Sequence, residues 1–215
     1  MMVSADHDHR RAGTIWMLDL DEPARDIQPL LPATIRRVGP DLAPALASTM
    51  ERDASSEWFH RFACGRRCYG AWVGEALASY GWVSFEEEYI GELNLQIRLS
   101  PGEAYIWDCA TIPSFRRKRL YSALLVHIIG ELHAEGYQRA WIGADLNNIA
   151  SQRGIARAGF HHVADLVVAR VLAMRQVWVQ GMPDAPEHIV AAARRAFLHD
   201  RDKVWSDVLA SAAHG

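Results

Sequence analysis

Residues 111–125 read TIPSFRRKRLYSALL, and they join two patterns that predict different elements. The run before the junction, 104–112, is rich in aromatic and β-branched residues, as is typical of a strand. From Leu120 to Leu132 apolar residues recur at helical spacing, which predicts a helix with one buried face. Gly136 is suited to end that helix. The stretch therefore predicts a strand that passes directly into a long helix.

Four cations stand where this helix begins. The first turn of a helix leaves backbone N–H groups unpaired and carries the positive end of the helix dipole, so it suits a pyrophosphate. Arg116, Arg117, Lys118 and Arg119 add positive side chains at the same end. By itself, a run of charges is more typical of a solvated surface. The interpretation as an anion site therefore depends on the elements around it.

Downstream of the long helix the sequence predicts a strand, a short helix and further strand structure. Residues 140–144 are apolar, Asn148 is suited to be the N-cap of a helix, and Gly159 can end that helix before a strand from Phe160. Residues 161–179 contain no Gly or Pro, so the pattern leaves one strand and two strands open.

The segments before the junction are short and mostly strand-like. Aromatic and β-branched runs predict strands, and Gly74-Glu75 suits a tight hairpin turn. The predicted strands up to the junction are 34–38, 68–73, 77–85, 93–99 and 104–112, and the further predicted helices are 42–50, 55–63 and 186–198. A strand–helix–strand crossover in the middle of this order predicts an α/β (α+β) fold.

The 215 residues divide into three predicted parts. Residues 1–32 are polar and interrupted by prolines, which favours an N-terminal arm. Residues 33–180 hold the predicted domain. Residues 181–215 form a C-terminal helical extension whose apolar stripes need a cover. A lid over a substrate pocket or a partner subunit in a homodimer would supply that cover.

Composition argues against several classes of protein. The formal net charge of −3 disfavours nucleic acid as a partner. The apolar stretches fall short of the about 20 residues that span a bilayer, and the first residues lack the apolar core of a signal peptide, so we expect a cytoplasmic protein without membrane contact. Cys64, Cys68 and Cys109 are an odd number, which weakly supports this expectation. The first two lack a second ligand pair, so we expect no metal.

Residues 111–160 resemble the GNAT N-acetyltransferase superfamily. That family combines Pro-x-x-Arg-x-x-Gly-x-Gly/Ala, between a strand and a long helix, with Asn-x-x-Ser/Ala and Gly-Phe at the two ends of the next helix. The residues here that match these motifs are Pro113, Arg116, Asn148, Ser151, Gly159 and Phe160. By element order the resemblance covers about residues 34–180.

The chain departs from the family at both glycines of the first motif, which are Arg119 and Tyr121 here. A small residue normally lets the backbone approach the pyrophosphate. A side chain at each position avoids the ligand if both have helical dihedrals, because the Cβ then points away. Arg119 would then contribute a phosphate contact of its own.

The resemblance implies a mixed, mostly antiparallel central sheet flanked by helices, with acetyl-CoA or another acyl-CoA bound at the strand-to-helix junction. The end of the strand would pair with the pantetheine arm, and a backbone N–H near Ala110 or Thr111 would polarise the thioester carbonyl. The implied cofactor-binding residues are Ala110, Thr111, Ile112, Arg116, Arg117, Lys118, Arg119, Leu120, Tyr121, Ser122, Asn148 and Ser151.

The acid and the base of such a reaction are less clearly marked. Many family members carry a tyrosine four residues before Gly-Phe, where this chain has Ile155. Ser151 or a water could replace it, or the thiolate could leave without a protein acid. Asp108 is our choice of base, with Tyr105 and 86–88 as reserves. Asp108 could equally bond neighbouring backbone, and three adjacent glutamates most often form a solvated loop.

The sequence thus favours an N-acyltransferase in which an amine, from a small molecule or a peptide, attacks acyl-CoA directly in a ternary complex. One alternative is a catalytically silent protein of the same fold that binds acyl-CoA or a metabolite. Another is an enzyme that transfers a long acyl chain to an amino-acid-like acceptor. Acceptor specificity would come from the first two helices, the segment near Glu86 and the C-terminal extension.

Overall fold

The computed structural model describes residues 10–23, 25–44, 55–90, 95–171 and 174–197. The elements in chain order are β1 (Arg10–Asp19), β2 (Thr34–Val38), the 3-10 turn η1 (Pro40–Leu42), α2 (Ser55–Ala63), β3 (Arg67–Val73), β4 (Ala76–Ser84), β5 (Glu87–Ile90), β6 (Leu95–Arg98), β7 (Glu103–Thr111), the 3-10 turn η2 (Pro113–Phe115), α3 (Leu120–Ala134), β8 (Arg139–Asp145), α4 (Ile149–Ala158), β9 (His161–Val171), β10 (Met174–Gly181) and α5 (Glu187–Phe197).

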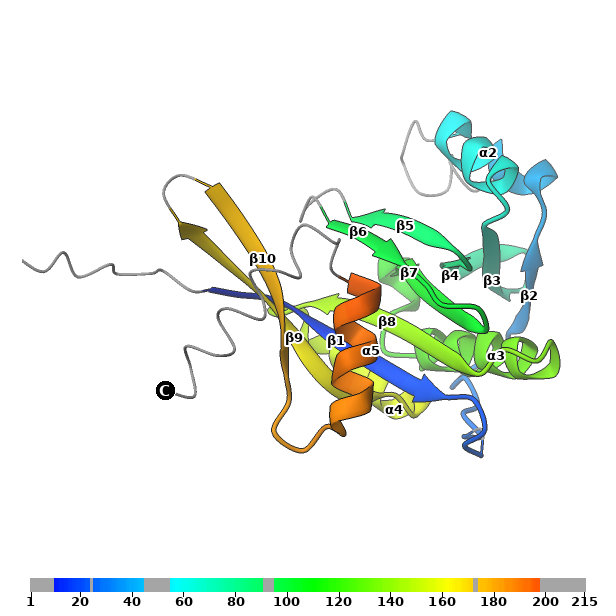
Figure 1. Cartoon of the computed structure of the whole chain (residues 1–215). Helices are drawn as coiled ribbons and strands as arrows, with labels where there is room; N and C mark the ends of the chain where they lie inside the picture. Colours follow the sequence, from blue (N-terminus) through cyan, green and yellow to red (C-terminus); the bar gives the residue numbers. More distant parts are fainter. Residues whose placement is uncertain (1–9, 24, 45–54, 91–94, 172–173, 198–215) are drawn as a thin grey trace, which may run out of the picture.

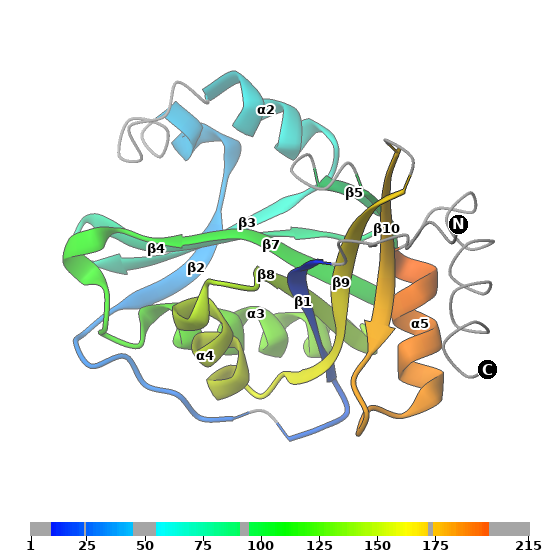
Figure 2. The same ribbon diagram turned by 90° about the vertical axis from the view of Figure 1, so that its left-hand side faces the viewer.

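These elements build one large sheet with helices on both faces. Its strand order is β10-β9-β1-β8-β7-β4-β3-β2, and β5 and β6 form a separate pair. Helices α3 and α4 cover one face, while α2, α5 and the β5–β6 pair lie on the other (Figures 1 and 2). Within the described sheet, β7 and β8 are the parallel neighbours and the other pairings are antiparallel. The predicted fold class is confirmed.

The parallel pair is short, and the two strands part beyond it. Residues 103–106 of β7 pair with 139–142 of β8. Further along, β7 continues beside β4 and β8 continues beside β1. The register of β7 with β4 shifts between Tyr80 and Trp82, and Asp108 takes a positive φ of 39°. The sheet is therefore split between the carboxyl ends of β7 and β8.

The residues expected to form an arm include a strand in the interior of the sheet. β1 pairs with β8 on one edge and with β9 on the other. Trp16 and Leu18 enter the core under α3, and Ile15 and Met17 enter the core under α5. A strand buried on both faces has a continuous apolar run instead of an alternating pattern, so it lacks the usual strand signal.

The open question over residues 161–179 is resolved as two strands. β9 and β10 pair antiparallel from Val171 and Met174 to Ala164 and Gly181. The predicted helix 55–63 is confirmed as α2. Residues 45–50 of the other predicted helix lie outside the described residues, as do residues 198–215 of the predicted extension.

A large hydrophobic core lies on each face of the sheet. The first joins α3 and α4 to one face through fully buried residues such as Leu124, Ile128 and Ile142. The second joins α5 to the other face around Trp141 and Phe197. Helix α5 is therefore part of the packed domain. Among the described helices none is long and apolar enough to cross a membrane.

We expect Phe197→Ala to lower the free energy of unfolding by about 3–5 kcal/mol, because the deletion leaves a cavity in a packed core. The Phe197 side chain is 0% exposed, with its ring centroid 5.7 Å from that of Tyr105 and 5.8 Å from that of Trp141. Denaturant unfolding measures the change. The control Phe59→Ala, at a ring that is 46% exposed, should cost well under half as much. Equal losses would contradict this packing of α5.

Candidate active site

A cationic cleft of about 800 Å³ opens at the start of α3. The end of β7, η2, the first turn of α3 and one side of α4 form its walls. The cations that line it are Arg116, Arg117, Lys118, Arg119, Arg153 and Arg157. None of the described lining residues is a carboxylate. The cleft is therefore suited to a ligand with several negative charges.

The structure brings nearly all of the predicted cofactor residues to this cleft. Ile112 is the exception, since its N–H bonds to the Ala78 carbonyl at 2.9 Å and it does not line the cleft. The sequence analysis missed Arg153 and Arg157 on α4. Their spacing of four residues places both on one face of that helix, and this spacing could have indicated that they contribute to the same site.

The backbone before α3 is left-handed at two positions. Arg117 has a φ of 63°, and Arg119, the N-cap of α3, has a φ of 61° and a ψ of 9°. The condition of helical dihedrals is therefore not met at Arg119. This conformation favours glycine and costs another L-residue about 1–2 kcal/mol. At Tyr121, which lies inside α3, helical backbone is confirmed.

Polar contacts tie the start of α3 to the start of α4. Asn148 is the N-cap of α4, as predicted, and its Oδ1 accepts a hydrogen bond from the Ser151 N–H at 3.1 Å. Tyr121 Oη lies 3.2 Å from Ser151 Oγ, and Ser122 Oγ donates to the Gly154 carbonyl at 3.0 Å. A Cβ on Gly154 would come within 2.5 Å of the Tyr121 ring. The ring thus fills the gap between the two helices.

Burial changes the acidity of two groups beside the cleft. Desolvation raises the pKa of the Tyr121 phenol and that of the Cys109 thiol well above their ordinary values. The thiol packs against β4, where a Cβ on Gly81 would lie 2.8 Å from Cys109 Sγ. Since a reactive cysteine needs a lowered pKa, Cys109 is a packing residue.

A second cavity, of about 900 Å³, lies on the other side of the split. Its walls come from β1, β7, β8, α2 and β5, with Phe197 at the end of α5. Asp108 and Tyr105, two candidate bases, line it. Asp108 and its neighbour Cys109 face different cavities, since Cys109 lines the cationic cleft. The two cavities therefore flank the same segment of β7.

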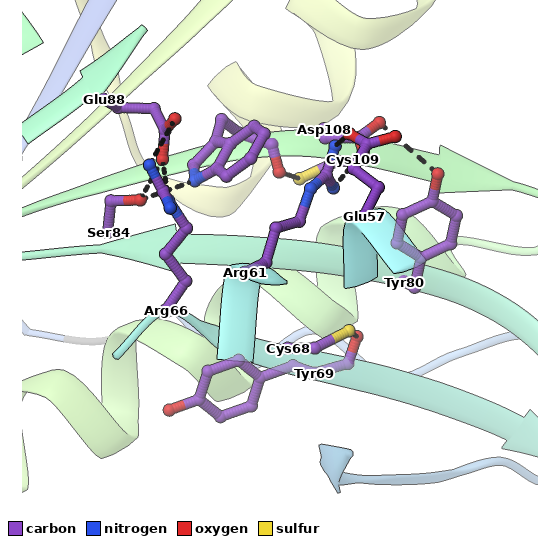
Figure 3. Close-up of polar contacts among 11 residues, drawn as sticks. Glu57, Arg61, Arg66, Cys68, Tyr69, Tyr80, Ser84, Glu88, Asp108 and Cys109 are labelled. Carbon is purple, nitrogen blue, oxygen red and sulfur yellow. Dashed lines mark hydrogen bonds and ion pairs between the residues drawn. The ribbon is translucent and has the colours of Figure 1, made fainter. Parts of the chain in front are cut away.

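Arg61 of α2 holds the Asp108 carboxylate in the second cavity. Its Nη1 lies 2.5 Å from Asp108 Oδ2, and the same guanidinium pairs with Glu57 one turn earlier (Figure 3). It also stacks on two indoles, 4.4 Å from the Trp107 ring centroid and 5.1 Å from that of Trp82. The sequence analysis missed Arg61, because only its pairing with Glu57 has a local signal.

Glu88, from the acidic run 86–88, is buried and fully engaged rather than solvated. Its side chain accepts two hydrogen bonds from Arg66, at 2.5 and 3.0 Å, and one from Ser84 Oγ at 2.5 Å (Figure 3). Ser84 Oγ in turn accepts from Trp107 Nε1 at 2.8 Å. The contacts make Glu88 an anchor for Trp107 and leave Asp108 and Tyr105 as the better candidate bases.

Comparison with known proteins connects this geometry to a family. A family model described as the acetyltransferase (GNAT) family matches residues 39–160. A GNAT-family acetyltransferase structure from Colwellia psychrerythraea aligns with a TM-score of 0.52 at 14% identity, over 74% of this chain and 55% of that one. A putative GNAT acetyltransferase from Novosphingobium aromaticivorans aligns with a TM-score of 0.51 at 15% identity, over 79% and 68%. No curated protein matches the chain.

The structural likeness, at these identities, establishes the fold. The chain spans about half the length of the Colwellia protein, namely the 55% that aligns.

We expect Arg119→Gly to have a free energy of unfolding about 1 kcal/mol above that of Arg119→Ala, because glycine adopts the left-handed backbone without strain. Denaturant unfolding of the pair measures the difference. Position 116 is the matched control, since Arg116 has an ordinary φ of −64°. There the glycine variant should not be more stable than the alanine variant. The same order at both positions would contradict the left-handed N-cap.

Proposed function

The chain belongs to the GNAT acetyltransferase family, and from that premise we propose that it transfers an acetyl or other acyl group from acyl-CoA to an amine by direct attack in a ternary complex. The observation that most supports this proposal is that two cavities lie on either side of one segment of β7. A donor in one cavity and an acceptor in the other could meet at the split without an enzyme-bound acyl intermediate.

The cationic cleft fits the charges of CoA. A pyrophosphate at the first turn of α3 would meet unpaired backbone N–H groups. Within the described part of the chain, the side chain of the N-cap residue Arg119 makes no capping hydrogen bond to them. The surrounding guanidinium groups suit the phosphates, since they form charge-assisted hydrogen bonds to phosphate oxygens. We assign the donor to this cleft.

The open edge of β7 fits the pantetheine arm. Residues 107–111 pair with β4 on one side and, among the described strands, have no paired neighbour on the other. A ligand with amide groups could add there as a further strand. We assign the polarisation of the thioester carbonyl to a backbone N–H at Ala110 or Thr111, both of which line the cleft.

We assign the amine acceptor to the second cavity, with Asp108 as the base. Its carboxylate faces that cavity and Arg61 fixes its orientation. The Tyr80 hydroxyl donates to Asp108 Oδ1 at 3.4 Å. Ser151 lines the donor cleft, and either Ser151 or a water is the candidate acid there. Phe197 at the acceptor cavity supports a role of the C-terminal region on that side.

A thiol-release assay with acetyl-CoA across a panel of amines, combined with calorimetric titration of CoA, tests this function. Release of CoA with at least one amine class supports the enzyme. Binding of CoA without release over a broad panel would instead favour the silent binder. Absence of CoA binding would refute both.

We expect the double variant Arg116→Ala/Arg119→Ala to weaken CoA binding by about 2 kcal/mol, given the strength of charge-assisted hydrogen bonds. Its affinity should also depend less on salt. Calorimetry at two ionic strengths measures both effects. The control Arg194→Ala/Arg195→Ala removes the same charge from α5, outside the lining of the cleft, and should bind normally. If the Arg116→Ala/Arg119→Ala variant binds CoA as tightly as the parent, these cations are only solvated surface charges.

We expect Asp108→Asn to lower turnover by about a hundredfold near neutral pH, the range for loss of a general base. CoA affinity should stay nearly unchanged and the pH profile should lose an ionisation. Asparagine tolerates the positive φ at this position, so the backbone is preserved. Glu57→Gln breaks the other ion pair of Arg61 and should lower turnover far less. Normal turnover of Asp108→Asn would move the role to Tyr105 or solvent.

A further inference from the structure

We propose that Tyr121 donates a hydrogen bond to the sulfur of the departing CoA thiolate and so stabilises the leaving group from α3. The inference rests on the proposed function, because it needs acyl-CoA in the cationic cleft. It assigns a specific task to a residue that sequence analysis placed only among the groups that bind the cofactor.

The phenol stands where the cleft meets the split in the sheet. Tyr121 lies in the first turn of α3 and reaches Ser151 on α4, with Oη 3.2 Å from Ser151 Oγ. Cys109 on β7 lines the same cleft and packs against the same core as Tyr121. A pantetheine arm along β7 that ends beside Asp108 would therefore carry its sulfur past this phenol.

A count of hydroxyl hydrogens distinguishes Tyr121 and Ser151 from the other hydroxyl groups of the cleft. Ser122 Oγ donates its hydrogen to the Gly154 carbonyl. Ser79 Oγ donates to the Ala110 carbonyl at 2.8 Å, so the 2.9 Å contact between Thr111 Oγ1 and Ser79 Oγ uses the hydrogen of Thr111. All of these hydrogens are committed within the protein.

The pair formed by Tyr121 and Ser151 holds two hydroxyl hydrogens, and the bond between them uses one. When Ser151 donates to Tyr121 Oη, the phenol hydrogen can point into the cleft. Ile155, one turn further along α4, is apolar and 0% exposed, so it offers no donor. Tyr121 is thus the best-placed hydroxyl for the sulfur.

A hydrogen bond, rather than proton transfer, follows from the chemistry of the two groups. Burial keeps the pKa of Tyr121 well above its ordinary value, whereas a thiol ionises near 8.5. When the C–S bond breaks, its electron pair goes to sulfur and the proton stays on the phenol. The hydrogen bond spreads the new charge, and the thiolate takes its proton from solvent.

Titration of the thiol of bound CoA tests the inference without turnover. A hydrogen bond to the thiolate favours the ionised form, so the bound thiol should be about tenfold more acidic in the parent than in Tyr121→Phe. Ultraviolet absorbance of the thiolate measures this. The variant keeps the ring that packs over Gly154, and the cations of the cleft are the same in both proteins.

Kinetics with a series of acetyl thioesters provides a second readout. Tyr121→Phe should lower turnover about tenfold with acetyl-CoA, at nearly unchanged CoA affinity. The loss should shrink as the leaving thiol becomes more acidic, because a stabler thiolate gains less from a hydrogen bond. A merely structural role of Tyr121 would lower all the rates alike.

Tyr137→Phe is the matched control, since Tyr137 packs on Phe85 outside the lining of the cleft and should behave like the parent. Ser151→Ala removes the partner of the phenol and should make the bound thiol less acidic by a smaller factor. It serves as the second test if Tyr121→Phe fails to fold. Unchanged thiol acidity in the folded variants would overturn the inference. So would a loss of rate that is independent of the leaving thiol.

These outcomes separate the inference from the proposed function. If the parent binds CoA but releases no thiol with any amine, the function fails and the titration still decides the role of Tyr121. If the parent is active and Tyr121→Phe matches it in titration and rate, the function stands and the inference falls. A parent that does not bind CoA would overturn both.

Discussion

Backbone pairing between β7 and β8 stops at Ile106 and Ile142, and the rest of the site depends on that interruption. Beyond it, each strand keeps a neighbour on its other edge, so the sheet stays intact while a gap opens inside it. Backbone groups along such an edge need hydrogen-bond partners from water or from a ligand. The split thus leaves an unpaired strand edge in the interior of the sheet as well as at its margins.

Side chains from other elements hold the split in shape. Asp108 faces one cavity and Cys109 faces the other, and Arg61 of α2 fixes the Asp108 carboxylate. Trp107 is held by Ser84 and lies under the Arg61 guanidinium. Because ions and aromatic rings share these contacts, the geometry of the second cavity is set by packing as well as by charge.

Local signals allowed prediction of the junction, of the long helix and of the Asn148 cap, since each depends on residues near one another in the chain. The pairing of Arg61 with Asp108 depends on distant segments, so no local pattern could reveal it. The left-handed backbone at Arg119 was hidden because its usual marker, glycine, is missing. Tyr121 stands at a position where the family has a small residue, so the sequence indicated only a departure from the motif. Its contact with α4 depends on how the two helices pack.

The interior position of β1 has a consequence for biosynthesis. On both edges β1 pairs with strands made more than a hundred residues later, β8 and β9. At ordinary rates of translation the segment waits on the order of ten seconds before its neighbours leave the ribosome. During that interval the apolar run 15–18 has no sheet to enter, which makes it a natural target for chaperones. Closure of the sheet around β1 is then a late, non-local step, of the kind that slows folding.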